Sequence, residues 1–94
     1  MEIKKMKVYN MTGRSGREVP NQFVIETDDG RYFQSYKSII AFRPYDRSKK
    51  IVLDEMKWDY SKTTGRYRSE FLNECTAETR KKIASGEYLL ADLN

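Results

Sequence analysis

The chain has 94 residues, of which 34% are charged, and its formal net charge is +4. It contains no histidine and one cysteine, Cys75, which argues against Ser/His and Cys/His catalysis, histidine-ligated metals and an internal disulfide. No segment approaches the roughly 20 consecutive apolar residues that a membrane helix requires. We therefore expect a single cytoplasmic domain over residues 1–94, without cofactor, metal or enzymatic activity.

The basic excess is concentrated in residues 1–20, where lysines and arginines outnumber glutamates. This segment is predicted to be a partly mobile arm with a short edge strand over residues 6–10. The glycines and arginines of residues 12–17 indicate a loop, which Pro20 closes. That loop lacks the Gly-Lys-Ser/Thr ending of a phosphate-binding P-loop, so no nucleotide site is expected there. The folded core is predicted over residues 21–94.

The strongest short-range signal is a β-hairpin in the first half of the chain. Apolar and polar side chains alternate over residues 22–27, as in a half-buried strand. The dipeptide Asp29-Gly30 favours a type I′ turn, in which both central residues have positive φ. Residues 32–36 form the returning strand. The nearly continuous apolar run of residues 38–42 is predicted to extend it through the centre of the sheet, either bent or covered on both faces.

Three further segments connect or extend this sheet. Residues 43–48 indicate a loop, because Pro44 cannot donate to a strand ladder and because Asp and Ser favour turns. Residues 50–53 are predicted to form the next strand. At the end of the chain, residues 88–93 fit either a last strand or a docked tail.

The second half of the chain has the pattern of two short helices. Hydroxyl residues over 61–64 can cap a helix that runs to about Asn73. Thr76 can cap a second helix, which Gly86 terminates. The predicted fold class is therefore α+β, with a small antiparallel sheet of three to five strands over residues 6–54, packed by the two short C-terminal helices.

Short motifs along residues 22–94 carry a family resemblance. They are Tyr32-Phe33-Gln34-Ser35-Tyr36, Ile40-Ala41, Trp58-Asp59-Tyr60-Ser61, Thr63-Thr64, Tyr67-Arg68, Phe71-Leu72, Ser85-Gly86-Glu87-Tyr88 and Asp92-Leu93. In this pattern the chain resembles a family of small uncharacterised proteins of phages and bacterial mobile elements, a domain of unknown function. The resemblance implies an origin and supplies no catalytic residues. Residues 1–20 and residues 43–49 look extra to the pattern, so any specialised function is sought there.

The candidate binding residues combine cations with aromatic side chains. Sheets that bind single-stranded nucleic acid use this mixture, because bases stack on aromatic rings while cations neutralise phosphates. Packing of the same aromatic rings in the core is the competing interpretation. The candidates are Arg14, Arg17, Tyr36, Arg43, Tyr45, Arg47, Lys49 and Lys50.

The lack of catalytic groups and the family resemblance favour a non-enzymatic accessory protein of a phage or mobile element. We expect it to bind a bacterial host protein and to modulate or inhibit that protein. The alternative is a nucleic-acid-binding module that uses the basic loop over residues 43–50 and exposed aromatics. No membrane partner is expected, and the sequence leaves the oligomeric state open.

The run Glu55-Met56-Lys57 has a chemical interpretation as well as a structural one. With Asp28, Asp29 or Asp54 it is similar to the acidic-x-Lys arrangement of metal-dependent nucleases, in which two carboxylates hold a divalent metal. A Glu-x-Lys spacing is common by chance in a chain so rich in charge. The structural interpretation, a solvated turn after a strand, is therefore preferred.

Trp58 and Cys75 are also given structural roles. Trp58 is predicted to lock the junction between strand and helix through a bond from its indole N–H to a backbone carbonyl. The alternative for Trp58 is an anchor in an interface. Cys75 is predicted to be a small, semi-buried residue between the two helices.

Overall fold

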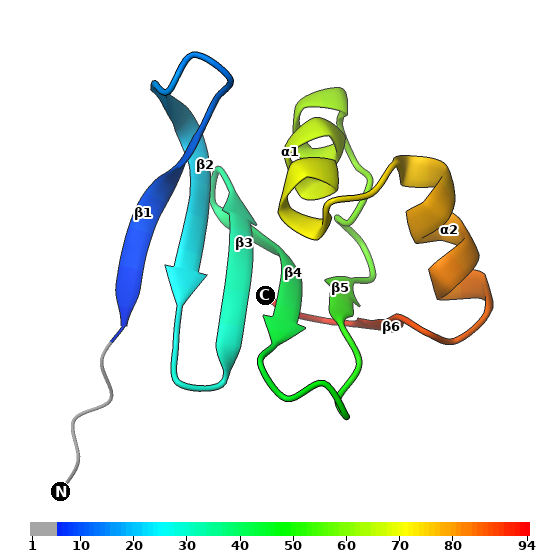
Figure 1. Cartoon of the computed structure of the whole chain (residues 1–94). Helices are drawn as coiled ribbons and strands as arrows, with labels where there is room; N and C mark the ends of the chain where they lie inside the picture. The colour runs from blue at the N-terminus through cyan, green and yellow to red at the C-terminus, as the bar shows by residue number, and fades with distance from the viewer. Residues whose placement is uncertain (1–5) are drawn as a thin grey trace, which may run out of the picture.

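The computed structural model describes residues 6–94, which form one mixed sheet and two helices (Figure 1). In chain order the elements are β1 (Lys7–Thr12), β2 (Glu18–Glu26), β3 (Gly30–Ser35), β4 (Ser38–Pro44), β5 (Val52–Asp54), α1 (Lys62–Leu72), α2 (Thr76–Ala84) and β6 (Leu89–Ala91). Strands that follow one another in the chain are neighbours in the sheet, from β1 to β6. The α+β class is confirmed. Within residues 6–94, however, the sheet has six strands instead of the predicted three to five.

Of the two alternatives for residues 88–93, a last strand is the correct one: β6 pairs in parallel with β5, whereas all other pairs are antiparallel. A parallel pair needs a long crossover connection, and α1 and α2 supply it. The prediction of a purely antiparallel sheet is therefore wrong at this edge. α1 packs against β3 and β4, α2 lies farther from β1 than α1 does, and neither helix lies over β1 (Figure 1). Within residues 6–94 no helix is long and apolar enough to cross a membrane.

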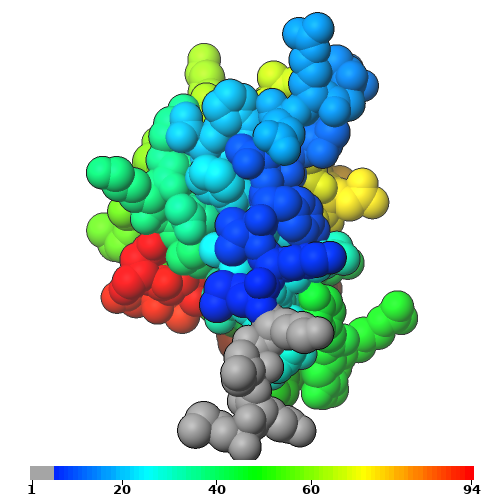
Figure 2. Space-filling model, turned by 90° about the vertical axis from the view of Figure 1, so that its left-hand side faces the viewer, coloured from blue at the N-terminus to red at the C-terminus, as the bar shows by residue number. Residues whose placement is uncertain are grey.

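The first hairpin, β1 and β2, includes most of the segment predicted as a basic arm. Residues 13–17 separate the two strands, and β2 begins at Glu18. Pro20 therefore lies inside a strand and does not close the loop as predicted. The register is irregular between Asn10 and Thr12 of β1, so the ladder is interrupted where proline lacks its N–H. β1 is an edge of the sheet, and Figure 2, which faces this edge, shows its atoms in blue at the surface.

β2 and β3 form the predicted hairpin, but with a different turn. Neither Asp29 nor Gly30 has a positive φ, so the turn is not type I′. Gly30 is the first residue of β3 and lies against β4, where an added Cβ would be 2.4 Å from the Arg43 carbonyl oxygen. The Thr27 hydroxyl donates to the Gly30 carbonyl at 3.0 Å and holds the turn closed. Glycine is needed here for the close approach of two strands.

The predicted long central strand is two strands, β3 and β4. They are joined by a two-residue turn in which Tyr36 has φ 56°. A bulge in β4 sets two consecutive residues, Ile40 and Ala41, opposite Phe33, and all three are fully buried. The apolar run thus reflects a hairpin followed by a bulge. Its predicted central position in the sheet is confirmed.

The core lies between one side of the sheet and the helices. Its buried members are Phe33, Ile40, Ala41, Leu53, Leu72 and Tyr88. Ser61 caps α1 by accepting from the Thr64 N–H, as predicted for this hydroxyl-rich segment. The N-cap of α2 is Cys75 instead of Thr76, and Cys75 is exposed instead of semi-buried. Gly86, with φ 81°, follows α2 as predicted.

Candidate functional site

One side of the sheet, here called the outer face, is turned away from the core. The strand register places one apolar residue from every strand in a single row across this face. The row consists of Val8, Ile25, Tyr32, Phe42, Val52 and Leu89. None of these residues belongs to the core cluster. Val8 is 59% exposed and Leu89 is 47% exposed, whereas the four residues between them are half-buried.

A second, shorter row lies beside the first on the outer face. It consists of Asn10, Phe23, Gln34 and Ile39. None of the residues in the two rows is charged, although 34% of the chain is. In β2 the alternation is confirmed, but the core side carries Gln22 and Val24, and Phe23 and Ile25 point outward. Sequence reasoning missed this face because a period of two does not reveal which side of a strand the helices cover.

The opposite side of the sheet carries a row of charges at one end. This charged row consists of Lys7, Glu26, Arg31 and Arg43, aligned across β1 to β4. Arg31 pairs with Glu26 at 3.3 Å, and the Tyr9 hydroxyl donates to the same carboxylate at 2.9 Å. Burial and this hydrogen bond raise the pKa of Tyr9 above its ordinary value. Within residues 6–94, Arg43 forms no ion pair.

A surface hollow of about 280 Å³ lies at the end of the charged row. It is lined by Arg31, Arg43, Pro44, Tyr45 and Arg47. The Tyr45 N–H donates to the Asp29 carbonyl at 3.0 Å, which fixes the loop after β4 against the turn between β2 and β3. Asp46 accepts from the Ser48 hydroxyl at 2.7 Å and from its N–H at 2.9 Å. These bonds form the turn that carries Arg47.

The predicted binding residues are divided between the two ends of the sheet. Arg14 and Arg17 lie between β1 and β2, and Tyr36 lies between β3 and β4, at the upper end in Figure 1. The others lie on or after β4, toward the opposite end: Arg43, Tyr45, Arg47, Lys49 and Lys50. The structure therefore does not gather them into one site. The cations of residues 1–5, which belong to the predicted arm, lie outside the described residues.

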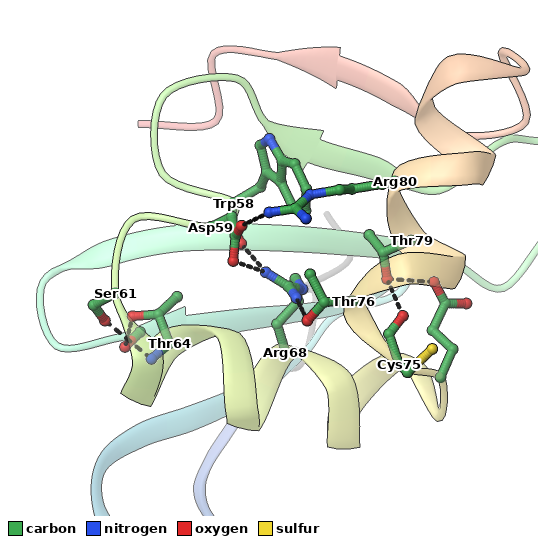
Figure 3. Close-up of polar contacts among 11 residues, drawn as sticks. Trp58, Asp59, Ser61, Thr64, Arg68, Cys75, Thr76, Thr79 and Arg80 are labelled. Carbon is green, nitrogen blue, oxygen red and sulfur yellow. Dashed lines mark hydrogen bonds and ion pairs between the residues drawn. The ribbon is translucent and has the colours of Figure 1, made fainter.

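A buried arginine connects the segment after β5 to both helices (Figure 3). Arg68 is 0% exposed, and its guanidinium donates to the Trp58 carbonyl and to Asp59 at 3.1 Å. The same group donates to the Thr76 hydroxyl at 2.7 Å and lies 5.0 Å from the centre of the Trp58 ring. Asp59 also pairs with Arg80 at 3.0 Å. Trp58 thus lies at the predicted junction, but its carbonyl and ring make the contacts instead of its indole N–H.

The residues considered for metal chemistry take part in the fold. Asp54 is 2% exposed and accepts from the N–H groups of Met56 at 3.2 Å and Leu93 at 2.9 Å. Burial opposes ionisation of Asp54, but its hydrogen bonds outweigh burial and lower its pKa. Lys57 donates to the Ser38 hydroxyl at 2.8 Å. Within residues 6–94 no three His, Cys, Asp or Glu side chains are grouped so as to hold a metal ion.

A known protein family matches most of the chain. Residues 6–86 match the profile of DUF8033, a family of unknown function. The chain belongs to the DUF8033 family. No curated protein and no solved structure matches it. Two segments were expected to be extra to the family pattern, residues 1–20 and residues 43–49. The matched range includes residues 6–20 of the first segment and all of the second.

In this DUF8033 protein, several residues that carry the family resemblance have structural roles. Arg68 holds the helices through the contacts described above. Thr64 of α1 shares a hydrogen bond of 2.9 Å with the buried Ser35 of β3. Phe71 stacks on Phe33 with ring centres 5.7 Å apart. These motif residues join the helices to the sheet, whereas Tyr32 and Gln34 of the same motifs lie on the outer face.

Proposed function

We propose that this DUF8033 protein is a non-enzymatic accessory protein that binds another protein through its outer face. The observation that carries the proposal is the pair of uncharged rows across the sheet. An antiparallel sheet that faces water on one side normally carries polar residues there. Contiguous apolar surface instead marks a place where another molecule binds. The longer row spans six strands, which is about 24 Å at roughly 4.8 Å between neighbouring strands.

A protein fits this face better than a nucleic acid does. Single-stranded nucleic acid needs cations for its phosphates beside the rings that stack on its bases. The two rows contain no cation, and the rings of Tyr32 and Phe42 lie 4.4 Å apart, packed on each other. The cations of β3 and β4 belong to the charged row on the other side of the sheet. An apolar surface of a partner protein is therefore the favoured ligand.

The resemblance to proteins of phages and mobile elements supplies the setting. Small phage proteins without a catalytic site commonly act by binding a host protein. In this proposal the partner is a bacterial host protein in the cytoplasm, which docking on the outer face modulates or inhibits.

Pull-down from nuclease-treated bacterial lysate tests the proposal. Ile25→Lys places a charge in the middle of the longer row, and we expect it to abolish recovery of a partner that the wild type retains. Met56→Lys is the matched control, because Met56 is 79% exposed and lies outside the rows, and recovery should be unchanged. Recovery by the wild type should persist from about 50 mM to about 300 mM salt, since the contacts are apolar.

The proposal is contradicted if the wild type recovers no stoichiometric protein or if Ile25→Lys recovers as much as the wild type. Circular dichroism checks that the variant is folded. Val8→Lys, at a 59% exposed position of the same row, is a milder second variant. Light scattering tests whether the outer face instead binds a second copy of the chain. A wild-type homodimer that Ile25→Lys dissociates would show self-association, and this result also contradicts a host partner.

A further inference from the structure

Two arginines of the charged row are close enough to repel each other. Arg31 and Arg43 lie directly opposite each other in β3 and β4. Like charges in this position destabilise a sheet. Glu26 offsets only one of the two, since it pairs with Arg31 at 3.3 Å. Arg43 has no carboxylate partner within residues 6–94, so its charge is left for another group to neutralise.

A third arginine meets this pair at the hollow described above. Arg47 lines the hollow together with Arg31 and Arg43, and no carboxylate among the described residues lines it. Asp46, next to Arg47 in the sequence, instead accepts two hydrogen bonds from Ser48. The volume of about 280 Å³ is several times the roughly 30 Å³ that one water molecule occupies. Three arginines therefore line a space large enough for a tetrahedral anion.

We propose that this hollow binds a phosphate group. Arginine presents pairs of N–H donors in a plane, which match two phosphate oxygens, and the bound anion offsets the repulsion between Arg31 and Arg43. Tyr45, 52% exposed, offers a ring face to a base attached to the phosphate. Free phosphate, a nucleotide and a nucleic-acid backbone share this chemistry. The hollow and the outer face lie on different parts of the molecule, so the proposal does not rest on the proposed function.

Thermal unfolding of the full chain in inorganic phosphate tests the site. At an ionic strength held constant with sodium chloride, phosphate should raise the Tm along a saturable curve, because it binds the folded state. Arg43→Gln removes one charge-assisted contact and should weaken the apparent affinity about tenfold. Arg14→Gln, which removes an exposed arginine at the other end of the sheet, is the matched control and should keep the wild-type affinity.

Two results overturn the proposal. One is a Tm that rises equally in sodium chloride and in phosphate at the same ionic strength. The other is an Arg43→Gln variant that binds phosphate as tightly as the wild type does. If Arg43→Gln is unfolded by circular dichroism, Arg47→Gln provides the same comparison at a loop position.

A nucleoside monophosphate and a short single-stranded oligonucleotide distinguish the sources of the phosphate. Tighter binding of both than of inorganic phosphate, with the gain removed by Tyr45→Ser, supports a nucleotide-bearing ligand. Equal affinity for the three probes supports a site for the phosphate group alone. Binding of none of them overturns the site.

Discussion

Arg68 is a charged side chain that stabilises the helical layer from inside the protein. Its guanidinium contacts the segment after β5 through Trp58 and Asp59, and α2 through Thr76. Breaking a buried charge pair by removing one partner is strongly destabilising, because the groups left behind remain desolvated and unpaired. The contribution of Arg68 therefore lies in fixing how the two helices meet.

We predict that Arg68→Met lowers the free energy of unfolding by about 2–4 kcal/mol. The loss should lie below that of a fully buried pair, because the Asp59 side chain is 29% exposed and retains Arg80 as a partner. Urea unfolding followed by circular dichroism measures the change. Arg66→Met, at an exposed position of the same helix, should stay within about 0.5 kcal/mol. Equal stability of the two variants would show that the network around Arg68 is dispensable.

The elements that were predicted well have local signals. Ser61 caps α1 and Gly86 follows α2 because each acts on backbone groups of its own turn. The errors arise where pairing with another strand decides the conformation. The dipeptide Asp29-Gly30 predicts a type I′ turn, but the constraint on Gly30 comes from β4. Pro20 indicates the end of a loop, but it lies in an irregular part of β2, and no pattern in the sequence marks that irregularity.

Gly30→Ala tests whether close strand packing is the reason for glycine at this position. The added Cβ would meet the Arg43 carbonyl oxygen at 2.4 Å and the Pro44 Cα at 2.9 Å, so the strands must separate locally. We predict a loss of about 1–3 kcal/mol in the free energy of unfolding. Gly13→Ala is the control, because its Cβ would meet Val19 at an ordinary 3.6 Å. A wild-type urea midpoint for Gly30→Ala would refute this explanation.

At the scale of the whole molecule, the two uncharged rows and the charged row lie on opposite sides of the sheet. The two rows of the outer face contain no charged residue, whereas arginines gather at one end of the opposite side. This separation was not predictable from composition, because it depends on the register of six strands. Five of the eight predicted binding residues lie on or after β4. The basic residues and the turn signals of this segment made it a candidate from the sequence alone. The outer face was missed, since Phe23 and Ile25 look like core residues in a linear pattern.

Acid stability of the whole chain depends on its buried carboxylates. Glu74 accepts from Tyr88 at 2.5 Å, Thr79 at 2.6 Å and Lys82 at 2.9 Å. Burial opposes ionisation of Glu74, but these bonds outweigh it and hold its pKa below 4.5, as hydrogen bonds also lower the pKa of Asp54. A carboxyl with a lower pKa in the folded state adds stability above its unfolded pKa. That stability is lost as the pH falls through the folded value.

We predict that the free energy of unfolding falls steadily once the pH drops below about 4.5 and that Glu74→Gln reduces this fall. At pH 7 the variant should be less stable than the wild type, and the difference should narrow in acid. Urea unfolding at a series of pH values measures both trends. Glu70→Gln, an exposed change in α1, should follow the wild-type profile. A constant difference between Glu74→Gln and the wild type at all pH values would rule out the linkage.

The parallel pair of β5 and β6 has a mechanical consequence. The chain leaves the sheet after β5, forms both helices and returns as the neighbouring strand, so the helical layer is tethered at each end to adjacent strands. The backbone bond from the Glu55 N–H to the Ala91 carbonyl, at 2.9 Å, continues this closure beyond the strands. Both ends of the helical layer are therefore held at the same edge of the sheet. Breaking the β5–β6 ladder would release both tethers together, which is a local unfolding event.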